Sequence, residues 1–380
     1  MNVLILGTAY PMRGGIAHFI ALLASHLKKK HAAQIFSFKR QYPSFLFPGK
    51  TQMEEGEPGI PVDAQAEIDS INPFNWIRVG LKARRLHPDV IVYKYWLPFF
   101  GPCFGTISAI AKWRRPHTRV IAICDNVIPH EHRPGDRVFT KYAFAFTDGF
   151  LVMSDAVERD LHTLVPHPQY RKAAHPVYEI FGRSIPKREA RARLGLAAEG
   201  NVLLFFGYVR KYKGLHTLID AMAALPATLP PVTLLVVGEY YGDEKEYRDH
   251  IARLGLEDRV RVHSDYVPNE RVAEYFCASD CVVLPYSSAT QSGIAQIAYQ
   301  FTKPVIATDV GGLAEVVIDG VSGLITRPES PALLAESIAR FYEEHLEARL
   351  SAGAAEEKKK YSWDALITAI EELSTTPEGN

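Results

Sequence analysis

The chain has 380 residues, of which 47 % are hydrophobic and 23 % are charged, a balance that excludes a disordered chain or a fibrous repeat and favours a globular protein of two or three domains. The 43 basic and 43 acidic residues cancel, but residues 1–185 hold 23 basic and 15 acidic residues, a net charge of +8, and the remainder carries −8. This asymmetry suggests two domains with different partners, with a membrane surface or nucleic acid for the basic one, although uneven surface charge without a function is equally expected.

The first half of the chain alternates short apolar strands with helical segments. A helix is predicted at residues 17–30, and strands are predicted at residues 2–6, 34–38, 89–93, 120–124 and 149–153. Ser154 is expected to cap the following helix, with Val157 on its inner face. Short strands separated by helices indicate parallel βαβ units whose sheet is covered on both faces.

A second series of the same kind begins near residue 200. Its strands are predicted at residues 201–206, 233–237, 260–263, 281–285, 305–308 and 323–325, and its helices at 215–224, 244–254, 271–278, 293–301 and 363–373. The segment 173–191, which contains two prolines and a glycine, is predicted to be an interdomain linker. The predicted fold class is α/β, with two Rossmann-like, doubly wound parallel-sheet domains at residues 1–180 and 181–355 facing a central cleft. A C-terminal helix and tail at residues 356–380 could cross back to the first domain.

The cysteines and the N-terminal segment point to a location. Cys103, Cys124, Cys277 and Cys281 form no CxxC pair, which argues against a zinc site or a disulfide framework and favours a reducing compartment. The first residues, MNVLILGTAYP, lack the basic region and cleavage site of a signal peptide, and no apolar run is long enough to predict a membrane-spanning helix. We therefore expect a cytoplasmic protein.

Ligands of doubly wound sheets bind at the carboxyl ends of the strands, so loops that follow strands are the candidate sites. The first of these loops has Gly14 and Gly15 just before a helix, where backbone amides attract anions. A simple tight turn is an equally good interpretation, and the GxGxxG dinucleotide pattern is absent.

Two further loops contain donors suited to phosphate. GYVRKYKG at residues 207–214 places Arg210 and Lys213 after a buried strand; a solvated charge run is the alternative, and the P-loop spacing is not matched. In residues 287–300, Gln291, Ser292 and Gly293 precede or begin a helix whose amides could hold a diphosphate, which is compatible with ordinary capping. In a fourth loop, at residues 311–315, glycines let the chain turn close to a ligand.

Four segments occur in one order over residues 201–327: FFGYVRKYKGLHTLIDAM, LLVVGEYYG, VRVHSDYVPNERVAEYFCASDCVVLPY and KPVIATDVGGLAEVVIDGVSGLI. They resemble the nucleotide-sugar domain of GT-B glycosyltransferases, in particular family 4 of the retaining enzymes. The first half matches more loosely, through YPMRGGIAHFIALLASHL and ICDNVIPHEH. The resemblance implies a GT-B architecture, with an acceptor-binding domain followed by a donor-binding domain.

The resemblance also implies roles for donor-site residues. The family's phosphate-binding lysine falls on Lys213, and Arg210 is expected to replace a partner arginine whose place is taken by Tyr208. Nucleobase contacts fall on Tyr266 and Val267. The glycine loop near the donor diphosphate falls on Gly14 and Gly15, and Gly207 belongs to the donor loop as well.

Other implied roles concern the transferred sugar and the acceptor. Asp125 takes the place of a histidine that touches the donor sugar, and it is expected to position that sugar or the acceptor hydroxyl. His18 and His130 are predicted to bind the acceptor. Two family glutamates, one for the sugar and one for the ribose, fall on Ala289 and Ile297. Because neither is acidic, we predict a variant subgroup with a retuned donor pocket.

The resulting hypothesis is a retaining, hexosyltransferase-type enzyme. It would move a sugar from a UDP- or GDP-sugar to a glycan or lipid-linked acceptor in cell-envelope polysaccharide, lipopolysaccharide or glycolipid biosynthesis. Retention in this family is thought to need no protein nucleophile, so none is named. No metal or other cofactor is expected, because Lys and Arg neutralise the phosphates and the chain has no DxD triplet.

Three alternatives remain open: a catalytically inactive GT-B subunit that binds nucleotide or glycan, a non-transferring GT-B relative such as a sugar-nucleotide epimerase or a phosphorylase, and a nucleic-acid binder, for which no reading motif is present. Residues 95–100, YWLPFF, lie between basic clusters at 84–85 and 112–115, and together with Lys28–Lys30 these would suit an anionic membrane surface. The favoured alternative is that these aromatic residues belong to the core. We expect a cytoplasmic protein, peripheral at the inner face of the membrane if it binds there.

Overall fold

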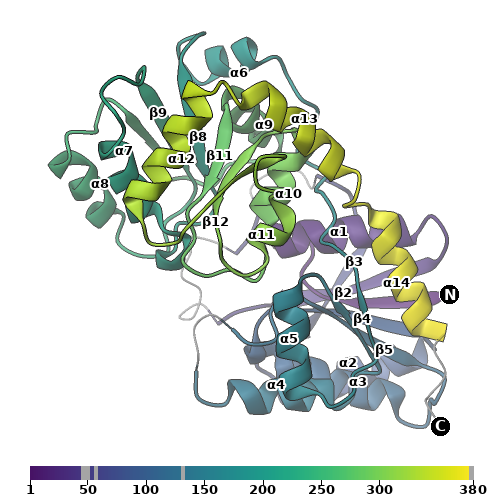
Figure 1. The fold of residues 1–380 in the computed structure, drawn as a ribbon. Coiled ribbons are helices and arrows are strands. Elements are labelled where there is room, and N and C mark those ends of the chain that lie inside the picture. The colour runs from purple at the N-terminus through teal and green to yellow at the C-terminus, as the bar shows by residue number, and fades with distance from the viewer. Residues whose placement is uncertain (44–51, 55–58, 130–132, 376–380) are drawn as a thin grey trace. The chain divides into compact units, whose positions relative to one another are not determined.

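The computed structural model describes residues 1–43, 52–54, 59–129 and 133–375. The chain divides into two compact units (Figure 1). The first unit is Met1–Pro176 together with Ser362–Asn380, and the second is Val177–Tyr361. The last helix of the chain therefore belongs to the unit that contains the N-terminus.

A parallel sheet forms the centre of the first unit. Within the described residues it has seven strands in the order β3-β2-β1-β4-β5-β6-β7. The strands are β1 Asn2–Leu6, β2 Ala32–Arg40, β3 Ala64–Asp69, β4 Val90–Tyr95, β5 Arg119–Cys124, β6 Gly149–Val152 and β7 Tyr170–Lys172. Every residue of β4 is buried, as expected for a central strand with helices on both sides.

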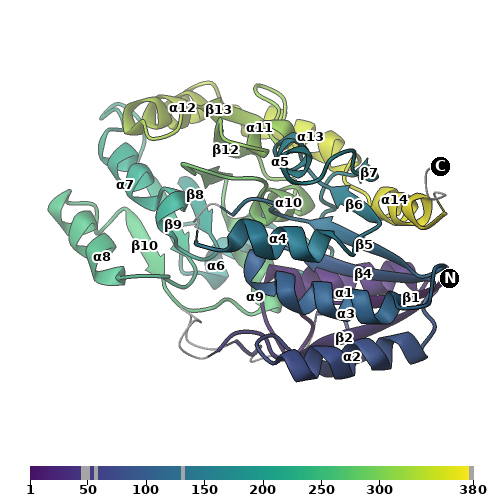
Figure 2. The ribbon, with the colours of Figure 1, turned by 90° about the horizontal axis from the view of Figure 1, so that it is seen from below.

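Helices cover both faces of this sheet (Figures 1 and 2): α2, α3 and α4 lie side by side on one face, and α1 and α14 lie on the other. The bounds are α1 Gly15–Leu27, α2 Pro73–Arg85, η2 Pro98–Phe100, α3 Gly101–Lys112, α4 Asp136–Phe144, α5 Asp155–Leu164 and α14 Trp363–Thr375. Trp363 anchors α14 on α1, with its ring centroid 5.1 Å from that of Phe19 and its ring stacked on His26.

The second unit repeats this design with six strands among its described residues, all parallel, in the order β10-β9-β8-β11-β12-β13. The strands are β8 Asn201–Phe206, β9 Val232–Val237, β10 Val260–His263, β11 Cys281–Leu284, β12 Val305–Thr308 and β13 Gly323–Thr326. Leu203 of β8 pairs with Leu234 on one side and Cys281 on the other, so β8 is central.

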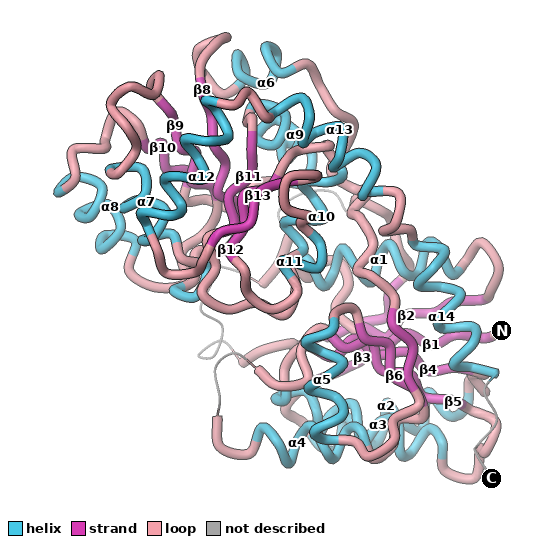
Figure 3. The backbone as a smooth tube through the Cα atoms, viewed as in Figure 1, coloured by secondary structure: helices cyan, strands magenta, loops and turns pink. Residues whose placement is uncertain are grey.

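Helices again alternate with the strands of this unit (Figure 3). The bounds are α6 Lys187–Arg193, η3 Lys211–Lys213, α7 Leu215–Ala223, α8 Glu244–Arg253, α9 Asn269–Ala278, α10 Gly293–Gln300, α11 Leu313–Val316, α12 Pro331–Glu343 and α13 Glu347–Lys358. Each unit has its own hydrophobic core, built from the inward faces of its strands and helices. The predicted α/β fold class, with two doubly wound parallel sheets, is confirmed.

Local predictions are confirmed in several places. Ser154 caps α5 by accepting a hydrogen bond from the Val157 amide, and Val157 is fully buried. The helix predicted at residues 17–30 begins earlier, at Gly15, and ends at Leu27. The four cysteines are free and buried.

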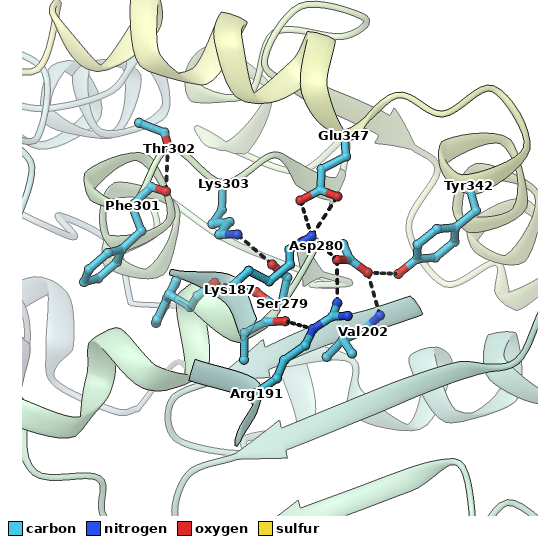
Figure 4. Close-up of polar contacts among 12 residues, drawn as sticks. Lys187, Arg191, Val202, Ser279, Asp280, Phe301, Thr302, Lys303, Tyr342 and Glu347 are labelled. Carbon is cyan, nitrogen blue, oxygen red and sulfur yellow. Dashed lines mark hydrogen bonds and ion pairs between the residues drawn. The ribbon is translucent and has the colours of Figure 1, made fainter. Parts of the chain in front are cut away.

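The predicted linker at residues 173–191 is wrong in its last part, because α6 begins at Lys187. Arg191, on that helix, is 2 % exposed and donates a hydrogen bond of 2.8 Å to Asp280 (Figure 4). Lys187 reaches the same carboxylate at 2.5 Å and also pairs with Glu347. A segment held by a buried ion-pair network is part of the second unit rather than a flexible connection.

The favoured interpretation of the aromatic run is supported. Tyr95 and Phe100 are fully buried, and the Phe100 ring lies 5.4 Å from Phe38 and 4.4 Å from Trp96. These aromatic residues belong to the core of the first unit, so this run does not provide a surface for lipid.

Candidate functional site

Glycines bring neighbouring loops together at the carboxyl edge of the second sheet. Gly207, directly after β8, has φ +97° and Gly238, directly after β9, has φ +137°. A Cβ atom on Gly238 would lie 2.3 Å from the carbonyl oxygen of Gly207. Only glycine allows this backbone conformation and this approach without strain, so the loops after β8 and β9 are in direct contact.

The loop after β11 is held in the same way from both sides. A Cβ on Gly214, in the β8 loop, would lie 1.9 Å from the oxygen of Pro285. A Cβ on Gly311, in the loop after β12, would lie 1.4 Å from the oxygen of Ala289. Three consecutive loops of the sheet edge are therefore packed backbone against backbone, at the edge where ligands of doubly wound sheets bind.

Lys213 is the half-buried cation of this edge. It is the last residue of η3, its Nζ lies 5.6 Å from the centroid of the Tyr286 ring, and a Cβ on Gly207 would be 3.3 Å from that Nζ. Burial and the nearby Arg210 guanidinium lower the pKa of Lys213 to about 8. Among the described residues, no carboxylate lies within ion-pair distance of Lys213.

Arg210 is the second cation of the same loop. Its guanidinium carbon lies 4.3 Å from the centroid of the Tyr241 ring, so the side chain is held by an aromatic face. Tyr241 in turn packs edge-on against Tyr208, at 4.7 Å between centroids. Within the described part of the chain, Arg210 also has no carboxylate partner. Two neighbouring cations without an acid are costly unless an anion joins them.

The N-terminus of α10 faces the same place. Its N-cap residue, Ser292, makes no side-chain capping bond, and its Oγ lies 3.4 Å from the hydroxyl oxygen of Tyr286, the residue under Lys213. The side chain of Ile294, in the first turn of α10, lies 3.2 Å from the Cβ position of Gly207. These contacts place Gly207, Lys213, Ser292 and Gly293 close together, and the positive end of the helix dipole adds to the two cations.

The positions expected to carry acids are apolar and buried. Ala289 is 7 % exposed and Ile297 is 5 % exposed. Gln296, beside Ile297 on α10, is buried, and its Oε1 accepts no hydrogen bond from any described residue. Gln291 is half-buried in the loop before α10. The donors and acceptors near the start of α10 are neutral.

Tyr266 and Val267 lie farther along this edge. They follow β10, which is the edge strand of the sheet and is separated from β8 by β9. Both residues are half-exposed. The structure thus places them after the outermost strand, two strands away from the strand that precedes the Lys213 loop, and their predicted contact with a nucleobase stays a prediction.

In the first unit, Gly14 and Gly15 form the start of α1. Gly14 is the N-cap, has φ +104°, and a Cβ added to it would meet no atom within 4 Å. His18, one turn into the helix, lies 4.0 Å from Glu54, and burial lowers the pKa of His18 to about 4. A neutral imidazole at this position can accept or donate a hydrogen bond near neutral pH.

Asp125 directly follows β5 and is held by an ion pair that the sequence analysis missed. Lys94, on the adjacent strand β4, donates to its Oδ1 at 2.7 Å. The Lys94 ammonium lies 3.4 Å from the centroid of the Phe19 ring and is 2 % exposed. Burial lowers the pKa of Lys94 and, with Lys94 nearby, lowers that of His175 to about 3. The available signal was a single lysine inside the apolar strand VIVYKY.

The last predicted site residue, His130, is not tested by the structure. His130 lies outside the described residues. In the described ranges, no three His, Cys, Asp or Glu side chains are grouped so that they could hold a metal ion. No described helix has the length and apolar character needed to cross a membrane.

The carboxyl edge of the second sheet combines Lys213, Arg210 and an uncapped helix N-terminus. Such an arrangement can bind a dianionic group and stabilise negative charge that develops on it. The carboxyl edge of the first sheet offers a carboxylate fixed by a buried lysine. The first arrangement suits an anion and the second suits a hydroxyl.

Comparison with known proteins agrees with these features. Residues 186–376 match the family model of glycosyl transferases group 1. A D-inositol 3-phosphate glycosyltransferase of Frankia alni is 34 % identical over 303 residues, covering 74 % of this chain and 72 % of that protein. The corresponding enzyme of Thermobispora bispora is 31 % identical and covers 76 % of this chain and 70 % of that protein.

Solved structures show the same fold. The Anabaena protein Alr3699/HepE, in complex with UDP-glucose, superposes with a TM-score of 0.76 at 21 % identity, covering 99 % of this chain and 100 % of that one. Sucrose-phosphate synthase from Thermosynechococcus elongatus superposes with a TM-score of 0.74 at 19 % identity, covering 98 % of each chain. The chain therefore belongs to the glycosyl transferases group 1 family of glycosyltransferases and has their GT-B fold.

Proposed function

We propose that this chain transfers a sugar from a nucleoside-diphosphate sugar, a UDP- or GDP-sugar, to a hydroxyl group of a glycan or lipid-linked acceptor, with retention of configuration. The observation that carries the proposal is the unpaired cation Lys213, placed between the glycine loop at Gly207 and the N-terminus of α10. A diphosphate supplies the negative charge that this place lacks.

In the proposed reaction, the bond between the anomeric carbon and the diphosphate oxygen breaks, and the negative charge on the leaving group grows. Lys213 and Arg210 are placed to neutralise that charge, and the amides that begin α10 add hydrogen bonds. Loss of one preorganised donor of this kind typically costs roughly 2.7–4 kcal/mol of transition-state stabilisation. The proposed chemistry assigns charge neutralisation to these residues and needs no metal. It names no protein nucleophile, because attack on the same face is proposed to come from the acceptor oxygen.

Asp125 is the proposed positioning group for the sugar or the acceptor hydroxyl. Its carboxylate is fixed by Lys94 at 2.7 Å and lies at the end of β5, where ligands of parallel sheets bind. The neutral imidazole of His18 is the proposed second acceptor contact. The acceptor is proposed to be part of a cell-envelope polysaccharide or glycolipid, assembled at the inner face of the membrane.

A second function is favoured by one observation. The two positions on which the resemblance places the family's glutamates hold the buried apolar residues Ala289 and Ile297. A chain that binds nucleotide through Lys213 but cannot orient the donor sugar would be a catalytically inactive binding subunit. Binding and turnover must therefore be measured separately.

The test begins with thermal shift of the purified full chain against UDP, GDP, ADP and CMP and their common sugars. A ligand that binds only the folded state at about 100 times its Kd stabilises by roughly 2.7 kcal/mol. We expect one nucleotide to give a clear shift, Lys213→Met to lose it, and Lys211→Met, an exposed neighbour in the same turn, to keep it.

Turnover is then followed with that nucleotide's sugars and a panel of acceptors. The panel contains D-inositol 3-phosphate, which two relatives carry in their names, and a lipid-linked sugar. Nucleotide release that requires an acceptor supports the transferase. A nucleotide shift with no release for any acceptor supports the inactive subunit, and no shift with any nucleotide contradicts both proposals.

A further inference from the structure

Two helices of the first unit, and the residue that ends a third, present exposed apolar side chains to solvent. On α2 these are Phe74, Ile77 and Leu81, with Phe74 83 % exposed. On α4 they are Val138, Phe139 and Tyr142, with Val138 68 % exposed. Large apolar side chains exposed in such a group mark an interaction site more often than chance exposure does. We call these residues, together with Trp113 at the end of α3, the apolar patch.

The helices that carry the apolar patch pack directly against one another, because α3 contacts both α2 and α4. Gly80 of α2 lies so close to α3 that a Cβ there would be 2.8 Å from the Cβ of Ile110. Gly105 of α3 would bring a Cβ within 2.7 Å of the Tyr142 ring on α4. Figure 2 shows α2, α3 and α4 side by side along one face of the sheet. Small residues at both contacts hold the three helices as a rigid layer.

Basic side chains surround the apolar patch. The bounds of α2, α3 and α4 contain one acidic residue, Asp136, and these basic residues: Arg78, Lys82, Arg84, Arg85, Lys112, Arg137 and Lys141. Arg78 and Lys82 pair with Glu67, and Lys112 pairs with Asp148. Within the described residues, no carboxylate lies within ion-pair distance of the other four. At helical spacing, positions 74, 77, 78, 81, 84 and 85 share the outward side of α2, so its charges and apolar side chains lie together.

Trp113 is the clearest anchor in this surface. It is 59 % exposed, and its ring centroid lies 5.0 Å from the guanidinium carbon of Arg84 and 5.2 Å from that of Arg114. An indole ring flanked by guanidinium groups suits the boundary between lipid headgroups and acyl chains, where Trp is enriched and long basic side chains reach the phosphates.

We propose that the layer α2–α3–α4 docks the first unit on an anionic lipid bilayer. Phe74, Ile77, Val138 and Trp113 would enter the headgroup region, while Arg84, Arg85, Arg114 and Lys141 contact lipid phosphates. The charge argues for this occupant. A second copy would bring equal positive charges face to face, and a duplex would leave the apolar side chains without a partner. This proposal builds on the lipid-linked acceptor proposed above. The observations behind it and the experiment that tests it do not depend on glycosyl transfer.

The test is co-sedimentation of the full chain with vesicles of phosphatidylcholine, alone or mixed equally with phosphatidylglycerol. We expect binding to the mixed vesicles only, and weaker binding at high salt. Phe74→Ser/Val138→Ser and Arg84→Glu/Arg85→Glu should each reduce the partition coefficient by about tenfold or more. The matched control, Lys28→Glu/Lys29→Glu, makes the same change of charge at the C-terminal end of α1, on the other face of the sheet, and should bind like the unmodified chain.

Two further readouts separate docking from misfolding and from catalysis. Vesicles should shift the Trp emission of the unmodified chain to the blue, and Trp113→Phe should remove most of that shift while the chain still sediments. Lys213→Met should sediment normally, so loss of nucleotide binding leaves this proposal intact. Equal binding by the two surface variants and the control, or no preference for anionic vesicles, overturns it. So does a concentration-dependent dimer that the surface variants abolish, in place of vesicle binding.

Discussion

The two edges of the second sheet differ in how their charged side chains are paired. At the amino edge, Asp280 is 3 % exposed and receives hydrogen bonds from Arg191 and from the Val202 amide, at 2.8 Å and 2.6 Å, while Lys187 bridges it to Glu347 (Figure 4). At the carboxyl edge, Lys213 has no carboxylate among the described residues. Buried charges that are fully paired maintain a structure, whereas an unpaired one is retained for a ligand.

The largest effect should follow from breaking the paired edge. Asp280→Ala leaves Arg191, 2 % exposed, without its acidic partner. Loss of one partner of a buried pair typically costs about 3–5 kcal/mol. The free energy of unfolding, measured by urea denaturation, should fall by that amount. Asp249→Ala, which breaks the exposed pair with Lys245, should leave the free energy of unfolding nearly unchanged, and equal effects of the two variants would contradict the assigned difference.

A smaller loss of stability is expected in the first unit. Asp125→Asn keeps a hydrogen-bond acceptor beside Lys94 but removes the charge that stabilises its buried ammonium. We expect a loss of about 1–3 kcal/mol in unfolding free energy and no change in nucleotide affinity, because the nucleotide is assigned to the second unit. If the nucleotide affinity, measured by calorimetry, falls together with the stability, Asp125 belongs to the donor site.

Nucleotide affinity should depend on pH through Lys213. Its pKa in the free protein is lowered to about 8, and a bound diphosphate would raise it again. Affinity is therefore full below about pH 8 and falls by at most about tenfold per pH unit above that value. Calorimetric titrations across pH 7–10 should show this slope in the unmodified chain and none in Lys213→Met. A slope that persists in the variant would assign the proton to another group.

The smallest predicted effect belongs to Arg210. Its guanidinium rests on Tyr241 at the rim of the loop, and it is half-buried like Lys213. Arg210→Met should weaken nucleotide binding by roughly 5- to 20-fold, near the typical 1.5 kcal/mol or so of a charged hydrogen bond. If calorimetry shows a larger loss of nucleotide affinity for Arg210→Met than for Lys213→Met, the proposed roles of the two residues are reversed.

How far the sequence predicted the fold is clear from individual elements. Buried central strands such as β8 are continuous apolar runs and were found within a residue. The edge strands β3 and β7 were missed, because AQAEID and YRK lack that pattern and gain their partners only from the sheet. Helix α2 was also missed, although Asn72 and Pro73 form a recognisable helix start.

The site was predictable to the extent that glycines and cations lie close together in the sequence. Lys213 and Gly207 share the loop after β8, and α10 begins in the loop after β11, three strands later in the chain. Lys94 and Tyr286 were missed, because their importance comes from neighbours far along the chain: Asp125 for one and Lys213 for the other. A lysine inside an apolar strand is a signal that deserves equal weight with a glycine loop.

The most direct test of the unpaired-cation account is the melting temperature of Lys213→Met, with and without the nucleotide found in the screen. Removing a half-buried cation that lacks an acid should leave the ligand-free melting temperature unchanged or raise it, while the shift caused by the nucleotide disappears. A lower ligand-free melting temperature together with an intact nucleotide shift would show that Lys213 maintains the fold and does not bind the diphosphate.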